Sequence, residues 1–220
     1  MTAEYATSKL NKVRQLRDKG RYDRETVHRI LDAGLVAQVA FVEAGKPVVV
    51  PMIYGRDGET VYLHGARKAR VIRMVEGSES ICLNVTLLDG IVLARSAFNS
   101  SMNYRSVTVF GTPSLVEGGA EKLRAMQIIS EHLMPGRWDE LRAPHEKEVK
   151  MTGVIAVKID AASAKVSAGM PVDEPDDYAI PVWAGILPLT SKLQNLQDDD
   201  RLLPGVKSSA AVRSLQNRTL

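Results

Sequence analysis

The sequence predicts a mainly β protein: a small antiparallel barrel with helices at its periphery. Six or seven short runs rich in β-branched and alternating apolar residues follow one another at close spacing. One helical pattern follows the central hairpin, and another precedes the last strand. Strands and helices therefore do not alternate as they would in an all-parallel α/β fold, and closely spaced strands joined by turns are typical of antiparallel barrels.

The composition indicates one soluble globular domain with appended segments. Of 220 residues, 45% are hydrophobic and 25% charged, which is enough to bury a sizeable core. We expect a basic arm at 1–22, the barrel domain at 23–189 and a polar tail at 190–220. The net charge of +3 is spread, because acidic residues lie among the basic ones between Lys9 and Arg29. Nucleic acid is therefore not an expected partner.

Cysteine and histidine are too sparse to suggest a metal site. Cys82 is the single cysteine, which excludes an internal disulfide and a cysteine-based zinc site. His28, His132 and His145 are scattered, so no metal ligands are predicted. No apolar run is long enough to cross a membrane, and no apolar leader follows Met1. We expect a cytoplasmic protein without a membrane partner.

Element boundaries follow from capping residues and periodicity. Asp23 is a good N-cap for a helix that Gly34 would end. The segment Arg56–Glu59 supplies a tight turn between two strands, and Asp89–Gly90 reads as another turn. We expect strands at 35–42, 48–54, 61–64, 81–88, 91–97, 106–112 and 153–159, helices at 70–77 and 120–134, and a short helix within 138–151.

The connection after the central hairpin carries the strongest signal for a ligand. There the segment His64–Ala66 leads into Arg67, Lys68 and Arg70 at the start of a helix. Cations in a first helical turn oppose the helix dipole unless an anion compensates them. Free N–H groups at a helix start also suit a phosphate. These cations are candidate phosphate contacts, and the alternative is a solvent-facing helix start.

Three further features have a structural and a functional interpretation. His64 is either a structural histidine or a group that orients a ligand or donates a proton near neutral pH, and it is the one catalytic candidate. The polar segment Asn103–Ser106 precedes an apolar strand and is either a turn or a binding edge. Trp183 either anchors the C-terminal segment or stacks on a ring.

Several blocks resemble the flavin-binding split-barrel family that includes pyridoxamine 5′-phosphate oxidase. These blocks are Val50–Tyr54, Val61–Ala66 and Asn103–Val107, in that order. Pro181–Gly185 is similar to the branch of flavin-nucleotide-binding and nitroimidazole-resistance proteins. The resemblance extends over roughly residues 23–189. It implies a six-stranded antiparallel Greek-key split barrel that forms a homodimer, with FMN bound at the dimer interface.

The same resemblance implies the cofactor contacts. Pro51 and Met52 would place backbone against the isoalloxazine ring, and His64–Ala66 would line the ring and the ribityl chain. The basic residues of 67–70 would hold the phosphate, and Asn103–Ser106 would approach the ring from a neighbouring strand. Trp183 would cover the ring from its own or the other subunit. The full set of expected FMN-binding residues is Pro51, Met52, Tyr54, His64, Gly65, Ala66, Arg67, Lys68, Arg70, Asn103, Tyr104, Arg105, Ser106 and Trp183.

The sequence matches the substrate-binding motif of the pyridoxamine phosphate oxidases less well than their flavin-binding blocks. Arg201–Pro204 matches their Arg-Leu-x-Pro pattern, but it lies in the polar tail rather than after a final strand. The strand before the hairpin also lacks the arginine and lysine of those enzymes. Oxidation of a vitamin B6 phosphate is therefore not expected.

Three functions remain in view. The first is an FMN-dependent oxidoreductase that takes electrons from NAD(P)H or another donor and reduces a small organic acceptor such as a nitro-aromatic. The second is a flavin carrier or sensor without turnover. The third is a split-barrel haem-binding protein with a histidine iron ligand. The residues also leave FAD or a deazaflavin open, although the lack of a second basic loop favours the mononucleotide.

Overall fold

The structure is a computed structural model that describes residues 3–220. The strands are β1 (Gly20–Arg21), β2 (Val36–Glu43), β3 (Lys46–Asp57), β4 (Thr60–Ala66), β5 (Ile81–Leu93), β6 (Ser101–Leu115), β7 (Thr152–Ser167) and β8 (Gly185–Pro188). The α-helices are α1 (Arg24–Ala33), α2 (Arg70–Glu76), α3 (Gly119–Leu133), α4 (Glu146–Met151) and α5 (Ala210–Leu215), with 3-10 turns η1 (Arg17–Lys19), η2 (Trp138–Glu140) and η3 (Pro175–Ala179). The predicted mainly β fold class is confirmed.

Hydrogen bonds join the strands into one sheet in the order β1-β7-β4-β3-β2-β5-β6, and β8 pairs with β5. An additional β6–β7 pairing makes a closed ring of β7, β4, β3, β2, β5 and β6. Neighbours β2 and β3, β3 and β4, and β4 and β7 are antiparallel. A ring leaves few free strand edges, which explains how long strands such as β6 and β7 stay paired.

The chain divides into two compact units, which are described separately. Unit 1 comprises the segment that ends at Gly34, together with Asn84–Val109 and Ala161–Ser191. Unit 2 comprises Leu35–Leu83, Phe110–Asp160 and Lys192–Leu220. The boundaries predicted at residues 22 and 189 are not tested by this division and stay a prediction. None of the helices within residues 3–220 is both long and apolar enough to cross a membrane.

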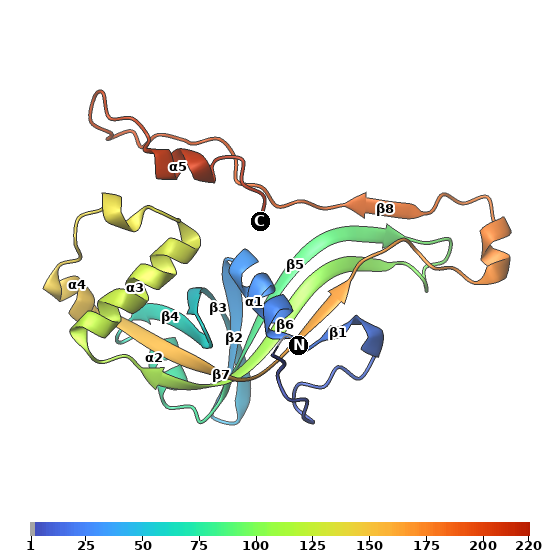
Figure 1. The fold of residues 1–220 in the computed structure, drawn as a ribbon, viewed down its shortest axis with the longest axis horizontal. Coiled ribbons are helices and arrows are strands. Elements are labelled where there is room, and N and C mark those ends of the chain that lie inside the picture. The colour runs from blue at the N-terminus through green and yellow to red at the C-terminus, as the bar shows by residue number, and fades with distance from the viewer. Residues whose placement is uncertain (1–2) are drawn as a thin grey trace. The chain divides into compact units, whose positions relative to one another are not determined.

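In unit 2, helix α3 packs on strands β3 and β4 (Figure 1). The contact is very close at Gly55, where an added Cβ would lie 2.7 Å from the carbonyl oxygen of Ile128. On β4, alternate residues Val61 and Leu63 are fully buried, as the two-residue period of a strand requires. This packing fixes α3 over the strand that carries His64.

In unit 1, helix α1 begins and ends where its capping residues predict. Asp23 accepts a 2.8 Å hydrogen bond from the backbone N–H of Thr26, and Gly34 is the C-cap. The N-terminal arm is also tied to this unit. The side-chain amide of Asn11 donates 3.0 Å bonds to the carbonyl oxygens of Ala6 and Ala162.

The turn predicted at Asp89–Gly90 is wrong, because β5 continues through it. Arg105 forms an ion pair with Asp89 across to β6, with Nη2 and Oδ1 2.7 Å apart, so the aspartate is neutralised within the sheet. Gly90 pairs with Pro188 of β8, a strand that sequence patterns did not indicate. The Asp-Gly pattern that predicted a turn is local, whereas Arg105 and Pro188, which pair with this segment and keep it extended, lie farther along the chain.

We predict that Gly55→Ala destabilises the fold by about 1–3 kcal/mol, because the methyl group would meet the backbone of α3 and force the helix away from β3. Thermal or urea unfolding measures the effect. Gly119→Ala is the matched control, since a Cβ there has no neighbour within 4 Å and alanine favours the helix. Equal losses of stability in the two variants would contradict the close contact.

Candidate functional site

The three cations after β4 lie where the sequence placed them, at the entrance of α2. Arg67 forms an ion pair with Glu76, with Nη1 and Oε2 3.0 Å apart. Arg70 is paired with Glu43, to which its Nε donates a 2.9 Å bond. Lys68 is exposed, and its side chain has no hydrogen-bond or ion-pair partner in the described part of the chain. The chain's own carboxylates thus compensate two of the three charges.

Backbone packing sets the path of this connection. The backbone N–H of Arg67 donates a 2.8 Å bond to the carbonyl of Met151, and that of Ala69 donates one to Ala66. Gly65 lies close to α2, since an added Cβ would be 3.2 Å from Cγ1 of Ile72. Ala66 ends the strand. The segment from Gly65 to Arg70 is therefore a tight, cation-rich corner.

The candidates on β3 differ in exposure. Pro51 is exposed, Met52 is 9% exposed, and Tyr54 is fully buried. The ring of Tyr54 packs against that of His132, with centroids 4.8 Å apart. In this chain the Tyr54 ring thus belongs to the core between β3 and α3. Contacts of these residues with a flavin stay predictions.

His64 is the most unusual polar side chain in unit 2. Its ring nitrogen Nδ1 is buried and has no hydrogen-bond partner among residues 3–220. Burial lowers the pKa of the imidazole, because an apolar environment disfavours the charged form. A buried polar atom without a partner is costly, and buried polar groups in proteins are nearly always satisfied. A neutral imidazole with an unused nitrogen suits a ligand or a metal ion.

A mostly apolar cavity of about 230 Å³ adjoins His64. Its lining comes from β3, β4, α3 and the segment after α3: Ile53, His64, Met126, Ile129, Ser130, Leu133, Met134 and Trp138. Sequence reasoning singled out His64 and identified α3 as a helix, but it did not place the other lining residues in a site. Their apolar spacing is that of an ordinary core-facing stripe, so only the packing of α3 on β4 reveals the cavity.

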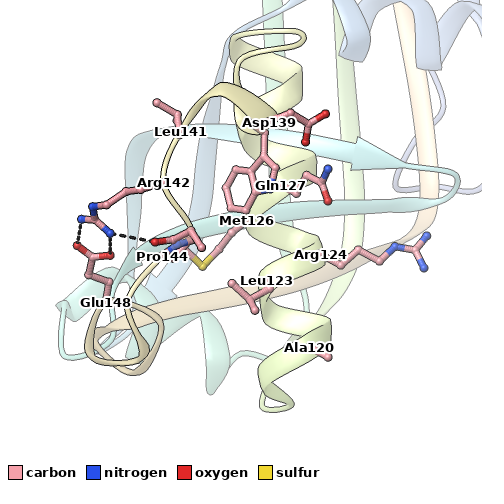
Figure 2. A pocket seen from close by; sticks show the side chains of 12 residues that line it. Ala120, Leu123, Arg124, Met126, Gln127, Asp139, Leu141, Arg142, Pro144 and Glu148 are labelled. Atoms are coloured by element: carbon pink, nitrogen blue, oxygen red, sulfur yellow. Dashed lines mark hydrogen bonds and ion pairs between the residues drawn. The ribbon is translucent and has the colours of Figure 1, made fainter.

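A larger cleft of about 930 Å³ shares Met126 and Trp138 with this cavity. Figure 2 shows Leu123, Met126 and Gln127 on the helix side of the cleft and Leu141 and Pro144 on the loop side. Arg142 closes one end through a bidentate ion pair with Glu148 (2.6 and 2.9 Å). The hydrogen bonds from Arg142 hold the pKa of the Glu148 carboxyl at about 2. His64 thus lines the apolar cavity, and the Arg142–Glu148 pair lies in the adjoining cleft.

Glu131 holds Trp138 in place. Its two carboxylate oxygens accept bonds from the backbone N–H groups of Gly136 (2.6 Å) and Trp138 (3.0 Å). This carboxylate therefore fastens the chain that leaves α3 back onto the helix. The indole is thereby kept as a shared wall of the cavity and the cleft.

The remaining candidates belong to unit 1. Asn103 is buried and donates a 3.1 Å bond to the carbonyl of Gly169, and Arg105 is paired with Asp89. Tyr104 and Ser106 alternate with them along β6 and are half-buried. Trp183 is 68% exposed and lies against Gly185, whose added Cβ would meet the ring at 2.8 Å. None of these contacts tests the flavin-binding prediction.

No group of three or more histidine, cysteine or acidic residues arranged to hold a metal ion occurs among the described residues. Cys82 is a free thiol whose pKa is raised by burial, which makes it a poor nucleophile. The metal ligand that this site could provide is therefore the neutral imidazole of His64, which lines the apolar cavity.

Comparisons with known proteins agree with the fold. The family model described as pyridoxamine 5′-phosphate oxidase matches residues 23–166. The flavocytochrome Anf3 from Azotobacter vinelandii is 38% identical, with 96% of this chain and 98% of that chain covered and a TM-score of 0.90. The FAD and heme binding protein from Mycobacterium smegmatis is 34% identical, with 90% and 98% covered and a TM-score of 0.87.

A putative 5-nitroimidazole antibiotic resistance protein from Bacteroides thetaiotaomicron is more distant. It is 25% identical, with 67% of this chain and 86% of that chain covered and a TM-score of 0.58. No curated protein sequence matches the chain.

We predict that Glu131→Gln loosens Trp138, because a neutral amide accepts the two backbone N–H bonds more weakly than a carboxylate. In a Trp183→Phe background Trp138 is the only tryptophan, so its fluorescence reports the change directly. Quenching by acrylamide should increase and emission should shift to the red. Glu146→Gln, which removes only an exposed pair with Lys150, is the control. Identical quenching in both variants would show that Glu131 does not position the indole.

Proposed function

This chain belongs to the pyridoxamine 5′-phosphate oxidase family, and on that premise we propose that it is a redox protein that binds a flavin nucleotide and a haem. Two structural relatives above 30% identity support the pairing, since one is a flavocytochrome and the other is a FAD and heme binding protein. In this chain, haem binding is supported by His64, whose buried Nδ1 has no hydrogen-bond partner within residues 3–220 and which lines an apolar cavity.

His64 fits the role of an iron ligand on three counts. The lowered pKa keeps its imidazole neutral, which is the form that coordinates a metal. It comes from a paired strand, β4, so its backbone is rigid. The walls around it are mostly aliphatic and aromatic, as a haem pocket requires. A bound haem would supply one-electron chemistry, while the chain would hold it and exclude water.

The cavity at His64 is smaller than typical cofactor sites of ~300–1,000 Å³, but the adjoining cleft is within that range. Met126 and Trp138 line both hollows, so a haem held by His64 would lie against these two side chains. The sequence left His64 open as a structural residue or as a group that orients a ligand or donates a proton. We favour iron ligation, because the buried Nδ1 has no hydrogen-bond partner within residues 3–220 that could relay a proton to it.

For the flavin, we propose that its phosphate binds the cation-rich corner at the entrance of α2. Arginine binds phosphate through several N–H donors, and a flexible lysine adds a point charge. Lys68 has no partner in the described residues, and Arg67 and Arg70 use only part of their donor capacity on Glu76 and Glu43. The lack of a second basic loop in the sequence favours FMN, whereas the similarity to a FAD and heme binding protein from Mycobacterium smegmatis favours FAD.

A flavin-dependent reductase of a small organic acceptor, such as a nitro-aromatic, is a second candidate function. The similarity to the Bacteroides protein favours it. In this proposal NAD(P)H is the electron donor and the active form is a homodimer. Oxidation of NAD(P)H by the flavin-loaded protein, with and without the acceptor, distinguishes a reductase from a flavin carrier without turnover.

We predict that the protein reconstituted with hemin shows a sharp Soret band, which His64→Gly loses and free imidazole restores. Restoration by imidazole separates loss of the iron ligand from misfolding, because only a folded cavity can hold the added ligand. His145→Asn is the matched control, since His145 is exposed and asparagine also caps a helix. An unchanged spectrum in His64→Gly would rule out iron ligation by this residue.

We predict that the double variant Lys68→Ala/Arg70→Ala binds flavin at least about tenfold more weakly, a loss of roughly 1.4 kcal/mol from charge-assisted contacts to phosphate. Quenching of flavin fluorescence gives the dissociation constants. Riboflavin, which lacks the phosphate, should bind the variant and the wild type equally. An equal loss of affinity for FMN and riboflavin would place the phosphate elsewhere.

A further inference from the structure

We propose that a groove beside α2 binds the adenosine monophosphate half of FAD, with Arg73 as its phosphate contact. The inference rests on the proposed flavin site and extends it along the same helix. The groove has a volume of about 690 Å³ and lies wholly within unit 2. That volume is in the usual range for cofactor sites, which are ~300–1,000 Å³.

Arg73 is the basic residue that lines the groove, and it has no side-chain partner within residues 3–220. Arg67, Arg70 and Arg73 follow one another at intervals of three residues. Residues three apart in a helix share a face, so Arg73 lies one turn beyond Arg70 on α2. Arg67 and Arg70 are paired with Glu76 and Glu43. The guanidinium of Arg73 is exposed and forms no hydrogen bond or ion pair within residues 3–220, although it lines the groove.

The groove connects directly to the cation-rich corner where we place the flavin phosphate. Glu43 lines the groove and is the carboxylate that pairs with Arg70. Since Arg70 already neutralises it, Glu43 opposes an incoming phosphate less than a free carboxylate would. A diphosphate that spans Arg70 and Arg73 would therefore pass from the corner into the groove along one helical face.

The remaining lining suits a base and a ribose. Phe41, Pro47, Met74 and Phe110 supply apolar and aromatic surface for a flat heterocycle. Glu79 is an exposed carboxylate in the same groove, and a carboxylate commonly accepts hydrogen bonds from ribose hydroxyls in dinucleotide sites. FMN would leave all of these groups unused. The groove therefore predicts a preference for the dinucleotide over the mononucleotide.

The test compares FAD and FMN on the full chain and on Arg73→Ala. Arg73→Ala should weaken FAD binding at least about tenfold, and FMN binding should change less than about twofold. AMP should compete with FAD for the wild-type protein and should fail to displace FMN. Arg124→Ala is the matched control, because Arg124 is an exposed arginine of unit 2 whose partner is Asp57, away from α2.

The outcomes distinguish failure of the adenylate groove from failure of the flavin site. Equal changes for FAD and FMN in Arg73→Ala would overturn the adenylate groove and leave the proposed flavin site standing. Indifference of both flavins to Arg73→Ala would also overturn it. A wild-type protein that binds neither flavin would instead overturn the proposed function itself. Arg73 is exposed, so circular dichroism should show the same fold in the variant.

Discussion

The contact between α3 and strand β3 is the constraint on which the proposed haem site depends. It is possible because Gly55 has no side chain, which lets the backbone of Ile128 approach to a distance that any Cβ would prevent. At this separation α3 places Met126, Ile129 and Leu133 over His64 of β4. A slightly more distant helix would admit water to the imidazole, and His64 would then lose both its lowered pKa and its apolar surroundings.

Two kinds of polar group in unit 2 contrast with one another. The ion pairs Arg67–Glu76, Arg70–Glu43 and Arg142–Glu148 are partly or largely exposed, so each contributes little to stability. Instead, these pairs orient the cation-rich corner before α2 and the loop between α3 and α4. Within residues 3–220, His64 and Arg73 have no such partner; His64 lines an apolar cavity, and Arg73 lines the groove beside α2. For His64 the missing partner indicates a ligand, because buried polar atoms in proteins are nearly always hydrogen-bonded. For the exposed Arg73 the indication is its position in the groove, where its charge is not compensated by a carboxylate of the described residues.

The proposed cofactors divide the chemistry between them. A flavin accepts electrons in pairs or singly, and a haem transfers one at a time, so a chain that holds both can pass electrons from a two-electron donor to a one-electron acceptor. The proteins at 38% and 34% identity have names consistent with that combination, and the similarity extends over almost the whole length of each. Fold alone does not establish it, since one fold hosts many functions. The side chains at His64 and along α2 therefore carry the functional argument.

The mainly β class, the helix from Asp23 to Gly34 and the position of α2 between Arg70 and Gly77 could all be predicted from the amino-acid sequence. These depend on capping residues and on local periodicity, which neighbours in the chain decide. The sequence also singled out His64 and the cations after it. Tertiary structure alone decided that β5 runs through Asp89–Gly90, since Arg105 and β8 lie far along the chain. The packing also pairs Arg67 and Arg70 with carboxylates, leaves Arg73 without one among residues 3–220, and places α3 over His64. Side-chain partners and cavities such as these arise only when distant segments pack together.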